Sequence, residues 1–213
     1  FLLGEKHKAI LITSTLPDEG KSFISLNIAS SFAVTHNKTV LVNFDLRKTN
    51  RYLKEFNINK KDGITSYLVN QSKFEDIIIH TDIPNLDIIS SGDIPPDPIA
   101  LISTDGVKRL INRLKEEYEY VIIDTPPFGL VTDPFLLMQY ADLKLYVSRL
   151  GTLTKKAFKQ SMEDISQKNI ENIFLVQNDV TKIEKSYYQE YSYEEQKPNF
   201  IVRFIKRRKL KSK

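Results

Sequence analysis

Residues 8–29 read "KAILITSTLPDEGKSFISLNIA", an apolar run followed by a polar loop and then by a helical pattern. The β-branched run at its start is typical of a buried strand. After the loop, Ile24, Ile28 and Phe32 recur at i, i+4 and i+8, which indicates one face of a helix. The loop itself ends in Gly-Lys-Ser at residues 20–22. A strand, a loop with this tripeptide and a helix, in that order, predict a phosphate-binding site.

The chemistry of such a loop depends on its backbone and on three side chains. Consecutive N–H groups and the helix N-terminus surround phosphate oxygens. Gly20 permits a positive φ or a close approach, Lys21 brings a positive charge on an exposed loop, and Ser22 offers its hydroxyl to Mg²⁺. The tripeptide alone fits an ordinary helix N-terminus with a serine near its cap equally well, so other segments must decide between the two.

Two further apolar runs end in polar side chains. "YVIIDTPP" (120–127) ends its run with Asp124, where a carboxylate can orient a Mg²⁺-bound water. "VLVNFDLRK" (40–48) carries Asn43 and Asp45, which lie on the same side of an extended chain. Either aspartate alone can simply start a turn. A phosphate-binding lysine and two such carboxylates, all at strand ends, favour a site for ATP and Mg²⁺.

Strand-like and helix-like segments alternate along the chain. The expected strands are residues 8–13, 39–44, 86–90, 120–124, 144–148 and 172–178, and apolar residues 107, 110, 111 and 114 form a helical stripe between two of them. Alternation of this kind predicts parallel strands joined by right-handed crossovers, with helices on both faces. The expected fold is therefore a doubly wound α/β domain that binds its ligand at the carboxyl ends of the strands.

Composition narrows the chemistry and the organisation of the chain. Its 213 residues include no cysteine and three histidines, which excludes zinc and thiol chemistry, so any metal must be held by oxygen. No apolar run approaches the roughly 20 residues of a membrane span. We expect a domain over residues 1–180, a tyrosine-rich tail over 181–199 and a basic segment over 200–213. Because the chain starts at Phe1 without a methionine, we expect it to be a piece of a longer chain, whose preceding region could contain membrane segments.

Five segments together carry a resemblance to a known family. They are "TSTLPDEGKSFISLNIA", "VLVNFDLRK", "GDIPPDP", "YVIIDTPPFGLVTDP" and "FLVQNDV". In these segments the chain, over about residues 8–180, resembles the cytoplasmic domain of bacterial tyrosine kinases, which are relatives of the MinD and ParA ATPases and serve capsule and exopolysaccharide export. The resemblance implies a P-loop fold, binding of ATP and Mg²⁺, and phosphorylation of protein tyrosine.

The resemblance also implies roles for individual residues. The nucleotide would contact Pro17, Asp18, Glu19, Gly20, Lys21, Ser22 and Phe23 of the loop, and Asn178 would read the adenine. The metal would be held by Ser22, Asp45 and Asp124. The catalytic residues would be Lys21, Asp45 and Asp124, with Arg47 on the same variant Walker A segment as Asp45.

Asn43 departs from the family pattern, which usually has aspartate at this position. An amide carries no negative charge and takes no proton, which leaves Asp45 as the expected base. Phosphoryl transfer depends largely on positioning and electrostatics, so the loss of one carboxylate can slow the reaction without abolishing it. The alternative is an ATP-binding assembly module of the MinD or ParA type that is nearly inert as a kinase.

The expected phosphate acceptors lie in "SYYQEYSY", residues 186–193. In the resembled family, one subunit offers a C-terminal tyrosine cluster to the active site of the next, and the match is to Tyr187, Tyr188, Tyr191 and Tyr193. Phosphorylation would add roughly −1.5 to −2 charges per site and repel neighbouring tails. The other interpretation is an aromatic segment that packs on the domain or on a neighbour.

The expected partners follow from the tail and from the family. Sister subunits would form a homo-oligomer, a ring in the full-length protein, with a membrane-anchored activator region in the same longer chain. Residues 201–213 carry seven Lys or Arg and no acid, so they fit either an anionic membrane surface or a solvated terminus. We expect no nucleic acid partner, because no second basic patch accompanies this segment.

Overall fold

A computed structural model describes residues 8–48, 51–56, 58 and 60–180. The chain divides into two units, Phe1–Asn178 and Asp179–Lys213. The tyrosine cluster of residues 187–193 and the basic segment of residues 201–213 lie outside the described residues. What the sequence predicts for them stays a prediction.

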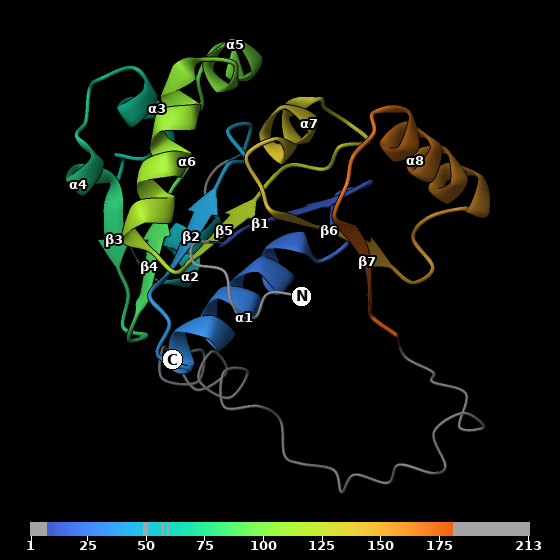
Figure 1. Cartoon of the computed structure of the whole chain (residues 1–213), viewed down its shortest axis with the longest axis horizontal. Helices are drawn as coiled ribbons and strands as arrows, with labels where there is room; N and C mark the ends of the chain where they lie inside the picture. The colour runs from blue at the N-terminus through green and yellow to red at the C-terminus, as the bar shows by residue number, and fades with distance from the viewer. Residues whose placement is uncertain (1–7, 49–50, 57, 59, 181–213) are drawn as a thin grey trace, which may run out of the picture. The chain divides into compact units, whose positions relative to one another are not determined.

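The described strands form one mainly parallel sheet (Figure 1). Its order is β3-β4-β2-β5-β1-β6-β7, and all neighbours are parallel except β3 and β4. The strands are β1 (Lys8–Ser14), β2 (Thr39–Asn43), β3 (Ile78–His80), β4 (Leu86–Ile89), β5 (Tyr120–Asp124), β6 (Leu143–Arg149) and β7 (Ile173–Asn178). The predicted strands are confirmed within a residue or two, and β3 is an addition.

Helices cover both faces of this sheet, as Figure 1 shows. They are α1 (Lys21–Val34), α2 (Arg51–Glu55), α3 (Ile64–Leu68), α4 (Phe74–Ile77), α5 (Pro98–Ile102), α6 (Asp105–Glu117), α7 (Asp133–Met138) and α8 (Lys155–Gln167). Side chains of α1 and α2 share one apolar cluster with the sheet, whereas α6 and α7 belong to the cluster on the opposite face. The predicted doubly wound α/β fold is confirmed.

The apolar stripe that the sequence predicts on α1 packs against the core, but it lies beside the most buried positions of the helix. Ile24, Ile28 and Phe32 are only partly buried, whereas Ala29 and Ala33 are fully buried. Small side chains let a helix lie close to the strands beneath it, so the larger residues flank the contact instead of filling it. Phe32 accordingly stacks on the ring of Tyr120, with 3.9 Å between the ring centroids.

Candidate nucleotide and magnesium site

The strand register brings the predicted polar residues to one edge of the sheet. β5 lies between β1 and β2, and Asp124 is opposite Ile12 of β1 on one side and opposite Asn43 of β2 on the other. The phosphate-binding loop (residues 15–20) leaves β1 at the same edge. This is the carboxyl end of three adjacent parallel strands, the place where doubly wound sheets bind ligands.

A cleft of about 390 Å³ opens at this edge. Its lining consists of Pro17, Asp18, Gly20, Lys21, Ser22, Asn43, Asp45, Lys48, Tyr52, Asp124, Thr125 and Pro127. The structure thus brings together most of the residues that the sequence analysis assigns to nucleotide and metal. Three others, Glu19, Phe23 and Asn178, are not in the lining.

Glu19 shapes the loop from beneath. Its side chain is fully buried, and its Oε2 accepts a hydrogen bond from Leu16 N at 2.7 Å. Its Oε1 accepts from Arg149 N and from Thr152 Oγ1, both at 3.3 Å, which joins the loop to the end of β6. The carboxylate is therefore engaged by protein donors on both oxygens. These bonds hold the backbone of the loop in shape.

Asn178 contacts the loop at Glu19 and Gly20. Asn178 Nδ2 donates to the backbone oxygen of Glu19 at 2.9 Å. Gly20 has φ +95°, and a Cβ at this position would lie 2.1 Å from Asn178 Nδ2. Glycine is required here both by the left-handed backbone and by the close approach of the amide. The end of β7 thus supports the loop, a contact that the sequence analysis did not foresee.

Lys21 is more enclosed than the sequence suggests. The expectation of an exposed loop lysine is wrong, because this residue is the first of α1 and only 9% of its surface is exposed. Burial lowers the pKa of Lys21, and the negative charges of Asp124, Asp45 and Glu19 oppose that shift. Phe23, two residues on, is 58% exposed.

Asp124 is buried at the floor of the cleft, with both carboxylate oxygens bonded. Oδ2 accepts a hydrogen bond from Tyr52 OH at 2.6 Å, and Oδ1 accepts one from Ser25 Oγ at 3.2 Å. Burial raises the pKa of Asp124, and hydrogen bonds and the charge of Lys21 counteract the rise. The sequence analysis missed Tyr52 and Ser25, which carry no motif of their own.

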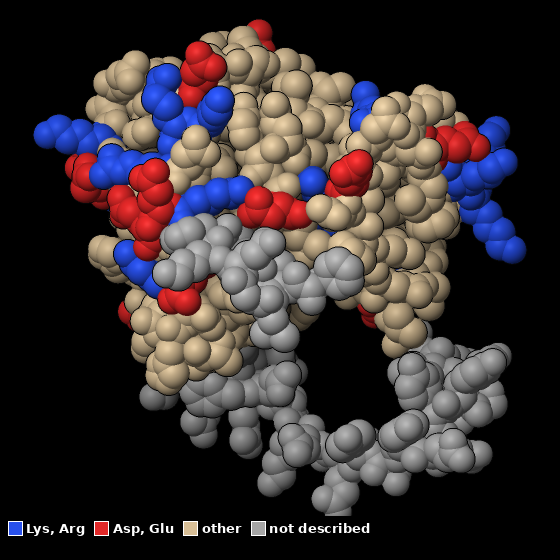
Figure 2. All heavy atoms as spheres, viewed as in Figure 1, with Lys and Arg blue, Asp and Glu red and all other residues tan. Residues whose placement is uncertain are grey.

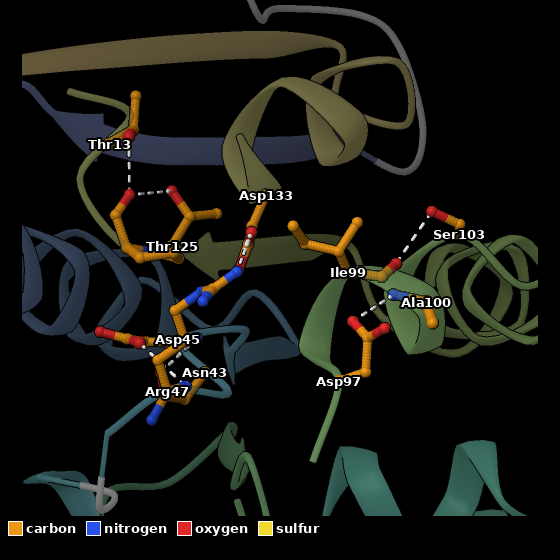
Figure 3. A network of polar contacts seen from close by, with 11 residues as sticks. Thr13, Asn43, Asp45, Arg47, Asp97, Ile99, Ala100, Ser103, Thr125 and Asp133 are labelled. Atoms are coloured by element: carbon orange, nitrogen blue, oxygen red, sulfur yellow. Dashed lines mark hydrogen bonds and ion pairs between the residues drawn. The ribbon is translucent and has the colours of Figure 1, made fainter. Parts of the chain in front are cut away.

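Two consecutive side-chain turns follow β2 (Figure 3). Asn43 Oδ1 accepts from Asp45 N at 3.1 Å, and Asp45 Oδ1 accepts from Arg47 N at 3.2 Å. These bonds let the chain bend around the mouth of the cleft. Burial raises the pKa of Asp45, while the bond from Arg47 N and the charges of Lys48 and Lys21 lower it.

Arg47 ties this turn to the helix on the neighbouring side of the cleft. Its Nε and Nη2 each donate to one carboxylate oxygen of Asp133 at 2.8 Å, as Figure 3 shows. Asp133 is the first residue of α7 and is fully buried. Nearby, Thr125 Oγ1 donates to Ile12 O at 2.9 Å and Thr13 Oγ1 donates to Pro126 O at 3.0 Å, which fixes β1 against the turn after β5.

The lining suits a hard cation beside phosphate groups. Hydroxyl and carboxylate oxygens of Ser22, Asp45 and Asp124 face the same cleft, and oxygen is the ligand type that Mg²⁺ prefers. Within the described ranges there is no group of three His, Cys, Asp or Glu residues that could form an all-protein metal cage. Mg²⁺ is usually held by one or two carboxylates plus substrate phosphates and water, so this donor set fits it.

Comparisons with known proteins agree with this geometry. A family model described as an AAA domain matches residues 8–167. The tyrosine-protein kinase CpsD of Streptococcus pneumoniae serotype 4 is 34% identical over 167 residues, covering 78% of this chain and 73% of that protein. The tyrosine-protein kinase ptk of Acinetobacter johnsonii is 32% identical over 187 residues, covering 87% of this chain but 25% of that longer protein.

Solved structures of known proteins share this fold. The kinase domain of the Escherichia coli tyrosine kinase ETK superposes with a TM-score of 0.77 at 29% identity, covering 88% of this chain and 73% of that one. The septum site-determining protein MinD of Pyrococcus horikoshii, solved with Mg-ADP, has a TM-score of 0.68 at 20% identity, covering 84% and 72%. The second likeness concerns the fold alone.

The fold is a P-loop fold of the MinD type. Within that class, the chain belongs to the family of bacterial tyrosine-protein kinases that includes CpsD. No helix of the described residues has both the length and the apolar character needed to cross a membrane.

Proposed function

We propose that this chain binds MgATP and transfers the γ-phosphoryl group to tyrosine side chains. The observation that carries the proposal is one cleft that gathers Lys21, Ser22, Asp45 and Asp124 at the carboxyl ends of adjacent strands. Membership of a family of tyrosine-protein kinases supplies the class of acceptor. Asp18 and Pro17 would line the phosphate side of the cleft, and Glu19 and Asn178 would hold the loop in shape.

Four residues of the cleft would take part in this reaction. Lys21, buried and facing two carboxylates, would offset the negative charge of the β- and γ-phosphates. Ser22, Asp45 and Asp124 would hold Mg²⁺ directly or through water, and the ion would supply charge neutralisation during transfer. Asp45 is the expected base: it would take the proton of the acceptor hydroxyl as the tyrosine oxygen bonds to the γ-phosphorus and the bond from that phosphorus to the β-phosphate oxygen breaks.

The proposed acceptors are Tyr187, Tyr188, Tyr191 and Tyr193 of a sister subunit. In the cell, this reaction would regulate capsular or exopolysaccharide synthesis and export. We further propose that the domain works on the cytoplasmic side of the inner membrane, in a homo-oligomer with a membrane-anchored activator region in the same longer chain. Residues 201–213 would contact the anionic membrane surface, and nucleic acid has no role.

A mixing experiment tests transfer between molecules. A Lys21→Ala chain offers tyrosines but should bind ATP roughly 10- to 150-fold more weakly, since charge-assisted contacts contribute about 1.5–3 kcal/mol. A chain with the four tail tyrosines changed to Phe can use ATP but lacks acceptors. Labelled ATP and Mg²⁺ should place phosphotyrosine on the Lys21→Ala partner, at a rate that rises with protein concentration. A mixture that stays unlabelled while the parent labels itself would refute transfer in trans.

Asn43 favours a second candidate, a MinD- or ParA-type module that binds ATP for assembly and has little kinase activity. Its amide oxygen accepts a bond from Asp45 N, so this position serves the turn without contributing a carboxylate. The labelling experiment separates the two functions. ATP binding without any phosphotyrosine on the parent chain would favour the assembly module.

A further inference from the structure

Tyr52 connects the two parts of the cleft that would hold the metal. Its hydroxyl donates to Asp124 Oδ2 at 2.6 Å and lies 3.3 Å from the backbone oxygen of Ser22 in the first turn of α1. Asp124 ends β5, and Tyr52 belongs to the short helix α2. The side chain of Tyr52 thus joins Asp124 to Ser22.

We propose that Tyr52 is a positioning residue of the magnesium site, one that fixes Asp124 and the first turn of α1 relative to each other. This inference rests on the proposed function, since it concerns the same metal. The torsion that orients an aspartate carboxylate is broad and roughly two-fold, so hydrogen bonds must set its plane. Here Tyr52 and Ser25 bond one oxygen each, from the protein side. An ionised carboxylate has about four acceptor positions, so these bonds leave acceptor capacity for a metal-bound water.

The surroundings of Tyr52 keep its hydroxyl in the donor role. The residue is 1% exposed and belongs to the apolar cluster that packs α1 against the sheet. The hydroxyl donates to Asp124 Oδ2 at 2.6 Å, which is the role that a neutral phenol takes beside a carboxylate. The ring is held by packing, which sets the direction from which the hydroxyl reaches Asp124.

Tyr118 offers a matched control elsewhere in the fold. It is 2% exposed, and its hydroxyl donates to Asp87 Oδ2 at 2.8 Å. Neither Tyr118 nor Asp87 lines the cleft. Tyr118→Phe therefore removes the same kind of hydrogen bond, from a buried tyrosine to a carboxylate, without touching the proposed metal site. Both Tyr→Phe changes keep the ring and its packing.

The test measures ADP affinity by calorimetry, with excess Mg²⁺ and with EDTA, for the parent, Tyr52→Phe and Tyr118→Phe. Loss of an outer-shell partner typically lowers metal affinity by 10- to 100-fold. In Tyr52→Phe, the ratio of ADP affinity with Mg²⁺ to ADP affinity in EDTA should be at least about tenfold smaller than in the parent. The affinity in EDTA should stay within about twofold of the parent. Tyr118→Phe should keep the full gain. In kinase assays, Tyr52→Phe should lower kcat at saturating ATP and raise the Mg²⁺ concentration needed for half-maximal rate.

Three results would overturn the inference. The first is a full Mg²⁺-dependent gain in Tyr52→Phe, and the second is an equal loss of affinity with and without Mg²⁺. The third is a parent whose ADP affinity does not respond to Mg²⁺, which would remove the metal from the proposed function as well. A parent that binds MgADP but forms no phosphotyrosine would refute the kinase proposal alone and leave the role of Tyr52 to be decided by the binding data. If Tyr52→Phe does not fold, ADP affinity is measured in the same way on Ser25→Ala. A full Mg²⁺-dependent gain in ADP affinity in that variant would overturn the inference that hydrogen bonds to Asp124 position the metal site.

Discussion

Replacing Arg47 by alanine should destabilise the domain, because the buried carboxylate of Asp133 then loses its positively charged partner. Asp133 is fully buried, and both of its carboxylate oxygens accept from Arg47 at 2.8 Å. Removing one partner of a buried pair typically costs about 3–5 kcal/mol because a charge is left uncompensated. The Arg47 side chain is 33% exposed, so water can reach the vacated position and reduce this penalty. We expect a loss of about 2–3 kcal/mol, or roughly 5–10 °C in Tm for a domain of this size.

Urea denaturation followed by circular dichroism measures this loss. The matched control is Lys159→Ala, which removes an ion pair to Glu163 at 3.7 Å whose side chains are 80% and 48% exposed, and which should change stability by less than about 0.5 kcal/mol. The double variant Arg47→Met with Asp133→Leu should recover most of the stability, since apolar residues often replace a buried pair without loss. A change below about 0.5 kcal/mol in Arg47→Ala, or a double variant no more stable than the single one, would refute the reasoning.

Three further substitutions test the cleft itself. Gly20→Ala forces an L residue into φ +95° and against Asn178, so nucleotide affinity in a fluorescent-ATP titration should fall by about tenfold or more. Asn43→Asp restores a carboxylate beside Asp124 and should raise the rate of tyrosine phosphorylation with ATP affinity preserved; an unchanged or lower rate would contradict this. Asp45→Asn should slow transfer by about 100-fold or more. Burial raises the pKa of Asp45, so the stability that protonated Asp45 contributes is lost as pH rises through its folded-state pKa. Thermal melts of the nucleotide-free protein across pH should show this loss in the parent and not in Asp45→Asn.

Basic and acidic side chains alternate on the visible face of the described domain, as Figure 2 shows. Arg113, for example, bonds to Glu75 and to Glu117 on the same surface. Physiological salt largely screens exposed charges that lie more than about 8 Å apart. Surface pairs of this kind should therefore contribute little to the ionic-strength dependence of nucleotide binding.

The alternation of strands and helices was predictable because it rests on local patterns. β-branched runs such as those of β1 and β5 are buried on both faces, so their apolar character marks them directly. The polar residues that end these strands converge because parallel strands share one carboxyl edge. By contrast, β3 has three residues and follows α4 without a gap, which leaves no local signal for a separate antiparallel strand.

The sequence by itself determined the class of fold and many of the residues that line the cleft, because strand, loop and motif are recognised over short distances along the chain. Only the tertiary structure decided what supports those residues. Asn178 under Gly20, Tyr52 on Asp124 and Asp133 on Arg47 each join positions far apart in sequence. Such pairs form only when whole helices and strands pack together, because a buried polar atom then bonds to a partner that the fold has brought close to it. A tyrosine or an aspartate without a motif gives no sign of that partner until the chain is folded.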